Sequence, residues 1–407
     1  MTATAPSGAA SEQTPAMLRY FDSGSVGALL VALLVSGSFP PSARAEGDWE
    51  ITPASERALD LGLAWLAQSQ GREGNWESND LGLVGMGALA FMSAGEAPGR
   101  GRYGTPLARS LDYVINNAKP SGLLNISHSQ RDMYNHGLAT FVLGQAHGMT
   151  SSRDHRLNAV LDRSLKLISA TQCDDGGWDY QARRQQNGHD LSLAVMQAKA
   201  LRSAVDSGLD VPPEVIDLAI KSVREHYCPE NGRRDLPESE QQKVPGQFTY
   251  GKGGGGGTIA MAAAGVVCLQ EFGQYDDWRI RKNMEVISAA VKQLPQARRR
   301  DGSMPFDAYT FYYVGQALYQ VGGTYWEECY PILRDYLVAS QMIDGNNSRV
   351  HGQWRDQGAQ GGGRVGGMPG DAYGTSVACF VLAIPNRYLP ILQEGKIESL
   401  RSRYGSE

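Results

Sequence analysis

Acidic, phenolic and imidazole side chains recur at the start of the apolar segments of this chain. Carboxylates, phenols and imidazoles serve proteins as general acids, general bases and metal ligands. Aspartate at a helix start also has a structural use, because its carboxylate accepts hydrogen bonds from the free N–H groups of the first turn. The sequence leaves both roles open, and we expect these residues to lie together at one end of the molecule. They are Asp80, Asp132, Tyr134, His136, His189, Asp190, Asp307, Tyr309, Asp371 and Tyr373.

Arginine gathers in the loops that precede these segments. A guanidinium binds phosphate or carboxylate through two parallel hydrogen bonds, and helix N-termini add partial positive charge. The arginines therefore predict a site for an anionic group, with a solvated basic rim as the alternative. They are Arg183, Arg184, Arg233, Arg234, Arg298, Arg299, Arg300, Arg349, Arg355 and Arg364.

Two kinds of predicted helix alternate along the chain and must position these side chains. One kind carries a single apolar stripe, as Ile280, Met284, Ile287 and Val291 do. The other kind, such as 258–269, is apolar or small on every face, which is typical of a helix buried on all sides. Six such pairs fill residues 53–390, and a sustained strand pattern is absent. We therefore predict an all-α fold in which six outer helices surround six inner ones as a closed double ring. An open superhelix of helix pairs is the alternative.

A glutamine, glycine and tryptophan motif follows several of the outer helices. The clearest copy is Gln172-Cys-Asp-Asp-Gly176-Gly-Trp178. Glycine suits a tight turn with positive φ, and the large indole can hold such a turn against its neighbours. We interpret the motif as structural. Degenerate copies supply Gln68, Trp76, Gln341 and Trp354.

With these turns, residues 46–390 resemble the prenyltransferase and squalene-oxidase repeat family, in which the turns are called QW motifs. The resemblance implies a single α/α toroid, as in the β subunits of protein prenyltransferases. It also implies a central cavity for an apolar, isoprenoid ligand, here with an anionic head. The segment Ile384-Pro-Asn-Arg-Tyr-Leu-Pro390 is similar to the ending of exported planctomycete proteins of this repeat class.

The catalytic signatures of that family are missing. Squalene–hopene cyclases use an Asp-x-Asp-Asp acid, but Gln172 and Gln274 stand at its first position. Protein prenyltransferases hold zinc through Asp-x-Cys and a histidine, whereas Gly374 stands where that histidine would be, and Asp-x-Cys does not occur. We therefore assign no catalytic residue and expect neither a metal site nor a cofactor. Mg²⁺ enters only if it bridges the carboxylates to an anionic ligand.

Composition and the N-terminal segment limit the classes of protein to which this chain can belong. The 407 residues are 42% hydrophobic, enough for a large core, and a net charge of −5 argues against nucleic-acid binding. Arg19, the apolar run Val26–Val35 and Ala43-Arg-Ala45 have the order of a secretory signal. We predict export to the periplasm or cell envelope with cleavage near Ala45, and an unstructured tail with one apolar patch is the alternative. Translation would start at Met1 or Met17.

These features divide the chain into an extension and signal (1–45), a toroid (46–395) and a C-terminal tail (396–407). After cleavage, the sequence holds no apolar run long enough for a transmembrane helix. Cys173 and Cys228 lie in equivalent junctions and could pair after export, while Cys268 and Cys379 fall in buried helices. Nothing in the sequence specifies an oligomeric state.

Three functions fit this organisation. The first is a toroid that binds an apolar, isoprenoid small molecule, with transferase or cyclase chemistry if it is active. The second is a non-catalytic extracytoplasmic interaction module that uses the long loops 228–257 and 342–370. The third is a polysaccharide-acting α/α-toroid enzyme with two carboxylates at glycosidase separation. The shape and lining of the interior would discriminate between them. A deep pocket ringed by aromatic side chains favours the first function, a filled or shallow interior favours the second, and an open cleft with paired carboxylates favours the third.

Overall fold

Segments with a single apolar stripe alternate with segments that are apolar on every face, and these two kinds of segment form two sets of α-helices. The computed structural model describes residues 49–76, 79–127, 132–149, 155–254, 256–296, 306–355 and 370–393. The predicted signal and tail, together with Arg298, Arg299, Arg300 and Arg364, lie outside these ranges. Thirteen α-helices occur in the described residues, so the all-α prediction is confirmed.

The outer set consists of helices that bury only one face, as their single apolar stripes predict. In α5, for example, Leu157, Leu161, Leu165 and Ile168 are buried, while Asp162, Arg163 and Lys166 are exposed. The set comprises α1 (Pro53–Ser69), α3 (Gly104–Asn116), α5 (His155–Thr171), α7 (Pro213–Glu225), α10 (Trp278–Gln293) and α12 (Gly323–Ser340).

The inner set is buried on nearly every face. In α9 every residue from Ala260 to Glu271 is buried. The inner helices are α2 (Leu81–Ser93), α4 (Asp132–Met149), α6 (Leu191–Asp206), α9 (Ile259–Glu271), α11 (Ala308–Val321) and α13 (Asp371–Ala383).

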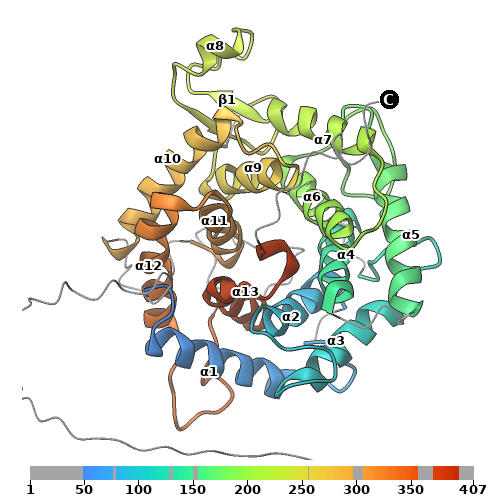
Figure 1. Cartoon of the computed structure of the whole chain (residues 1–407), viewed down its shortest axis with the longest axis vertical. Helices are drawn as coiled ribbons and strands as arrows, with labels where there is room; N and C mark the ends of the chain where they lie inside the picture. Colours follow the sequence, from blue (N-terminus) through green and yellow to red (C-terminus); the bar gives the residue numbers. More distant parts are fainter. Residues whose placement is uncertain are drawn as a thin grey trace, which may run out of the picture. The chain divides into compact units, whose positions relative to one another are not determined.

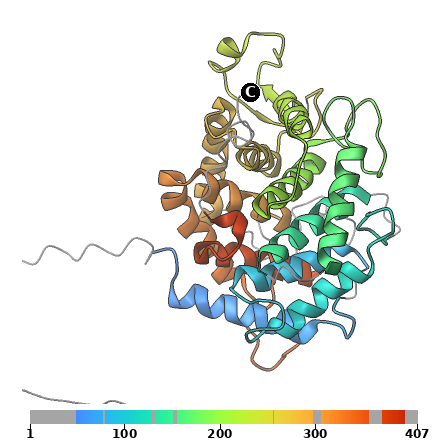
Figure 2. The same cartoon turned by 45° about the vertical axis from the view of Figure 1, so that its right-hand side comes forward.

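Each inner helix packs on the next inner helix along the chain, and α13 packs on α2. Figure 1 shows the six inner helices with the outer helices around them, and Figure 2 shows the same packing after a turn of the view. Successive outer helices run alongside, with contacts between α3 and α5, α10 and α12, and α12 and α1. Consecutive inner helices run in the same chain direction, because each returns through an outer helix.

One feature differs from the strand-free prediction. Strands β1 (Tyr227–Pro229) and β2 (Gly246–Phe248) pair antiparallel, with Cys228 opposite Gln247. Three residues are too few to produce a visible alternation in sequence. The pair forms the base of an arm that carries the short helix α8 (Glu238–Gln241), which projects from the helices in Figure 1.

The last described residues pack against the C-terminal ends of inner helices. After the short 3-10 turn η3 (Ile384–Asn386), the turn η4 (Pro390–Leu392) packs on α4 and α6. The backbone N–H of Ile391 donates to Gln145 Oε1 at 3.0 Å. Gln145 Nε2 donates in turn to Ser203 Oγ at 2.8 Å, so the ending is tied to two inner helices.

Candidate functional site

Asp190 is the most heavily bonded of the predicted site residues. As the N-cap of α6, its Oδ1 accepts from the backbone N–H of Leu193 at 3.3 Å and from the Ser192 hydroxyl at 2.5 Å. Its Oδ2 accepts from the Tyr180 hydroxyl at 2.6 Å and from His189 Nδ1 at 3.0 Å. Capping is therefore confirmed here, and both carboxylate oxygens already serve groups of this chain.

The bond from His189 fixes the tautomer of its imidazole. A carboxylate can only accept, so Nδ1 carries the proton and the neutral ring keeps Nε2 as an acceptor. The side chain is about half exposed, at 56%, and the Tyr180 ring packs edge-on against it with ring centroids 4.4 Å apart. His189 is thus an imidazole whose orientation is fixed by Asp190 and Tyr180.

The other four aspartates split between capping and tying loops to helices. Asp307 caps α11 by accepting from the backbone N–H of Thr310 at 2.8 Å. Asp132 and Asp371 are the first residues of their helices, and they accept from Asn125 Nδ2 at 2.7 Å and Gln353 Nε2 at 2.9 Å. Asp80 occupies the N-cap position of α2 without a side-chain cap bond.

His136 is held on both sides by the backbone. Its Nδ1 accepts from the N–H of Leu124 at 3.1 Å, and its Nε2 lies 3.1 Å from the carbonyl oxygen of Ser164. That carbonyl can only accept, so Nε2 carries the proton. The ring is completely buried, which lowers the pKa of His136 to about 4. These bonds give His136 a structural role, and it has no nitrogen left for a ligand.

Tyrosines from three inner helices meet near the N-terminal ends of those helices. Tyr134 of α4, Tyr309 and Tyr313 of α11, and Tyr373 of α13 are all buried. The rings of Tyr309 and Tyr313 pack edge-on with centroids 4.8 Å apart. Burial raises the pKa of Tyr134, Tyr309 and Tyr313 well above the ordinary value, and the neighbouring phenols add to the shift of Tyr134 and Tyr313. We call these four residues the tyrosine cluster.

Two tyrosines in or near this cluster, Tyr313 and Tyr250, were not predicted from the sequence. Tyr313 follows Tyr309 by one helical turn, a spacing that places both rings on one face and could have been recognised. Tyr250 comes from the loop after β2, and its phenol is close enough to Asp190 and Asp307 for both to raise its pKa after burial has done so. Hydrophobic periodicity cannot predict a residue that enters the site from a loop.

The described arginines are engaged by acidic residues of their own loops. Arg183 binds Asp179 at 2.9 Å, Arg184 binds Asp174 at 2.8 Å, and Arg233 binds Asp235 at 2.8 Å. All three guanidinium groups are more than half exposed. This arrangement fits the alternative of a solvated basic rim. Of the other described arginines of the set, Arg234 donates to the Glu225 carbonyl oxygen, and Arg349 and Arg355 are exposed.

The glutamine and tryptophan turns bind successive outer helices together. Gln172 Nε2 donates to the carbonyl oxygen of Gly176 at 3.1 Å and to that of Val215 in α7 at 2.8 Å. Trp178 Nε1 donates back to the carbonyl oxygen of Ile168 in α5 at 2.9 Å. The buried indole therefore holds the turn to the helix before it, and the glutamine holds it to the helix after it.

The turn that follows α12 has the same hydrogen bonds, and they join the last outer helix to the first. Gln341 Nε2 donates to the carbonyl oxygens of Gly352 at 2.9 Å and of Ala58 in α1 at 2.8 Å. Trp354 Nε1 donates to the carbonyl oxygen of Leu337 at 2.8 Å. A turn near the C-terminus thus fastens the first outer helix.

In the first turn the equivalent glutamine is Gln70, two residues after the predicted Gln68. Gln70 Nε2 donates to the carbonyl oxygen of Pro106 in α3 at 2.9 Å, whereas Gln68 is exposed. Trp76 Nε1 donates to the carbonyl oxygen of Leu66 at 2.9 Å. In all three described turns, the tryptophan donates to the carbonyl oxygen of the residue four positions before the glutamine. The first copy of the motif is too degenerate for this spacing to be recognised in the sequence.

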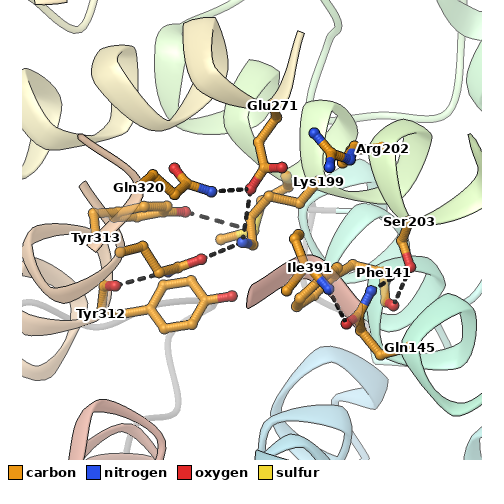
Figure 3. A network of polar contacts seen from close by, with 12 residues as sticks. Phe141, Gln145, Lys199, Arg202, Ser203, Glu271, Tyr312, Tyr313, Gln320 and Ile391 are labelled. Atoms are coloured by element: carbon orange, nitrogen blue, oxygen red, sulfur yellow. Dashed lines mark hydrogen bonds and ion pairs between the residues drawn. The ribbon is translucent and has the colours of Figure 1, made fainter. Parts of the chain in front are cut away.

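A buried ion pair lies between the inner helices, as Figure 3 shows. Lys199 Nζ of α6 lies 3.4 Å from Glu271 Oε1 of α9, with both side chains 1% exposed. Lys199 also donates to Gln316 of α11 and lies 4.4 Å from the centre of the Phe141 ring. Desolvation lowers the pKa of Lys199, although Glu271 opposes that shift. Four inner helices therefore contribute to one buried cluster around the Lys199 ammonium group.

Neither a metal centre nor a disulfide is formed by the described residues. Within these ranges, no three or more His, Cys, Asp or Glu side chains gather in a way that could hold a metal ion. Cys173 and Cys228, which sequence reasoning considered as a pair, are free thiols. Among the described helices, none combines the length and the apolar character needed to cross a membrane.

Comparison with known proteins adds no assignment. No model of a protein family matches the sequence, and no curated protein matches it.

Proposed function

We propose that residues 49–393 form a single α/α toroid of the prenyltransferase and squalene-oxidase repeat type. The contacts of each inner helix with the next, and of α13 with α2, support this arrangement. The bond from Gln341 to Ala58 supports it independently, because it joins the last repeat to the first. Without such a joint, an open array of helix pairs would leave the apolar faces of its end helices exposed.

We further propose that the interior binds an apolar, isoprenoid small molecule. The observation that carries this proposal is the tyrosine cluster, in which the buried phenols of α4, α11 and α13 lie close enough for Tyr309, Tyr313 and Tyr373 to add to the rise that burial causes in the pKa of Tyr134. Aromatic faces bury a large apolar area, and their electron-rich surfaces suit unsaturated hydrocarbon. The oriented imidazole of His189, beside Asp190, would lie at the same helix ends.

The ligand is recognised in this proposal by its hydrocarbon chain rather than by an anionic head. Arg183, Arg184 and Arg233 are each bound by a carboxylate, so a diphosphate would have to displace an existing partner. A prenyl alcohol should therefore bind about as tightly as the matching diphosphate. No catalytic residue and no cofactor are assigned.

Photo-crosslinking tests the location and the class of this ligand. A benzophenone analogue of farnesol should label the purified protein saturably, and unlabelled farnesol should compete. Mass spectrometry should place the label in peptides from α4, α11 or α13. Labelling that farnesol does not suppress, or labelling confined to the outer helices, would contradict the proposal.

An interaction module is the second candidate, and the arm favours it. Residues 230–245 between β1 and β2 are largely exposed, yet the arm is held in place by an ion pair between Glu238 and Arg279. The Trp278 indole donates to the same carboxylate at 3.4 Å. An ordered, exposed projection is costly for a chain to maintain unless something binds it.

Replacing 231–244 by a short glycine linker separates the two candidates. The shortened protein should keep its melting temperature and its farnesol labelling if the interior carries the function. Loss of a defined envelope partner from the shortened protein, with labelling of the intact protein absent, would favour the interaction module.

We also propose that the chain is exported and cleaved near Ala45. The motivation is the order of Arg19, an apolar run and Ala43-Arg-Ala45 in the sequence. N-terminal sequencing of the protein from its native host should find a chain that starts near Glu46. Soluble protein that retains 17–45 would reject this export.

A further inference from the structure

A pocket lies at the opposite ends of the inner helices from the tyrosine cluster. It measures about 1080 Å³ and is bordered by the last residues of α9 and α11 and by the chain ending at 391–393. Its walls include four aromatic side chains, Trp49, Tyr275, Tyr319 and Trp326. This volume is at the upper end of the range for small-molecule sites. We call it the C-terminal pocket.

Two buried carboxylates face this pocket. Glu50 Oε1 accepts from Arg387 Nη2 at 3.0 Å and from the Trp326 indole. Glu271 Oε1 accepts from Gln320 Nε2 at 2.8 Å and pairs with Lys199. The bonds of both carboxylates to other described residues fall on Oε1, which leaves each Oε2 as an acceptor for a ligand.

The pocket has further acceptor character. Gln320 Oε1 is buried and lacks a hydrogen-bond partner among the described residues, while its Nε2 is fixed by Glu271. Buried amide oxygens without a partner are rare because their desolvation is uncompensated. The C-terminal ends of α9 and α11 also lie here, and the partial negative charge of a helix C-terminus favours cations.

Arg387 of the chain itself shows that the side chains of this pocket can bind a cation. Its guanidinium lies over the Tyr319 ring, 5.7 Å from the ring centre, while it binds Glu50. Arg387 has a φ of 54°, the one left-handed non-glycine backbone in the described ranges. Such a conformation costs free energy and persists only where surrounding contacts hold it. A cation bound by a carboxylate and an aromatic face is one such contact.

Among the described residues, the charged side chains that line the pocket are paired apart from Glu327, and Glu271 pairs with Lys199. Arg202 binds Asp206 at 2.8 Å, and Arg387 binds Glu50. Glu327, which lines the pocket from α12, is exposed and adds a further negative charge. Glu327 and the helix C-termini therefore give the pocket a net negative character, which favours an ammonium group over an anion, and the aromatic faces add to this preference.

We propose that the C-terminal pocket binds an organic ammonium ligand of the aliphatic diamine or polyamine class. The carboxylates accept from the ammonium groups, and the aromatic walls contact the methylene chain and the cation. This proposal does not depend on the isoprenoid proposal, since the two sites lie at opposite ends of the inner helices.

Titration calorimetry with three probes of one chain length tests the ligand class. Cadaverine carries two ammonium groups, pentanediol carries two hydroxyls and glutarate carries two carboxylates. We expect cadaverine to bind about tenfold or more tightly than the diol, because one charge-assisted contact is worth about that much. Equal affinity for all three probes, or tighter binding of glutarate, would overturn the proposal.

Matched variants test the location. Glu327→Gln should weaken cadaverine about threefold or more, whereas Glu328→Gln, one residue along and engaged with Lys292 at 2.6 Å, should not. Tyr275→Ser should weaken it similarly. Tyr388→Ser, which alters another exposed tyrosine outside the pocket lining, should leave it unchanged.

All four substitutions are at exposed positions, so folding should survive, and circular dichroism checks this. If the pocket variants and their controls weaken cadaverine equally, binding is non-specific and the proposal is wrong. Loss of cadaverine binding with farnesol labelling retained would leave the isoprenoid proposal standing, and the reverse would leave this one standing.

Discussion

At the residue scale, burial lowers the pKa of two histidines, His136 and His226. His136 and His226 are each almost completely buried, and burial lowers the pKa of both to about 4. In the unfolded chain both rings would titrate near their ordinary value of 6.5. The unfolded state therefore binds more protons than the folded state between these two values, and stability must fall as pH falls through that window.

We expect the free energy of unfolding to drop steadily between about pH 6.5 and pH 4, by about 3 kcal/mol for His136 alone. Urea unfolding at a series of pH values measures this loss. His136→Gln should flatten the slope by about half, because His226 still contributes. His155→Gln, which alters an exposed ring on α5, should leave the slope of the native protein unchanged. An unchanged slope in the His136 variant would contradict this account.

The Gln172 side chain acts through two buried carbonyl groups. Gln172→Leu keeps the volume of the side chain but removes the donor to Gly176 and Val215. Leaving buried acceptors without a donor costs about 1–3 kcal/mol, so we expect a loss of about 2 kcal/mol in urea unfolding. Gln186→Leu, an exposed position in the same junction, is the control and should change stability by less than about 0.5 kcal/mol.

At the element scale, three turn glycines press against the next outer helix. Gly74, Gly176 and Gly352 all have positive φ, with values of 102°, 83° and 96°. A Cβ on any of them would overlap backbone atoms of the neighbouring outer helix. Each of these turns therefore requires its glycine for two reasons. One is the backbone conformation, and the other is the close approach of the turn to the neighbouring helix.

A pair of alanine substitutions separates these two requirements. Gly208 also has positive φ, at 74°, but a Cβ there would meet open space. Gly208→Ala should cost about 1 kcal/mol, the price of a left-handed alanine. Gly176→Ala should cost at least about 2 kcal/mol more, because its Cβ would overlap the Leu218 carbonyl and push α7 away. Equal costs in thermal unfolding would show that only the backbone conformation matters.

At the scale of the whole molecule, inner helix α9 links α6 to α11. Deleting 212–274 removes α7 and α9 together with the arm between them. If the inner helices close on themselves as we propose, the remaining pairs cannot bridge the gap, and the product should not fold. Circular dichroism and size-exclusion chromatography measure this. A monomeric, cooperatively melting product would indicate an open solenoid, in which loss of one pair shortens the array.

Much of the helical organisation was predictable from the sequence, because hydrophobic periodicity reports how much of a helix is buried. The single stripe of α10 and the all-round apolar α9 predicted an outer and an inner helix, and both are as expected. The turn around Gln172 was predictable as well, since its glycine and tryptophan have specific backbone and packing uses. The first turn shows the limit of such reasoning, because Gln70 and Gln68 differ only in what they reach across space.

Tertiary structure alone decided which side chains share a site. The tyrosine cluster joins residues 134, 309 and 373, and the C-terminal pocket joins residues 50, 271, 320 and 387. Periodicity describes one helix at a time, whereas these sites depend on which helix ends meet. The roles of Asp190 and His136 were likewise open in sequence, because capping, ligand binding and core hydrogen bonding use the same residue types. Only the partners of each polar atom distinguish these roles, and packing determines those partners.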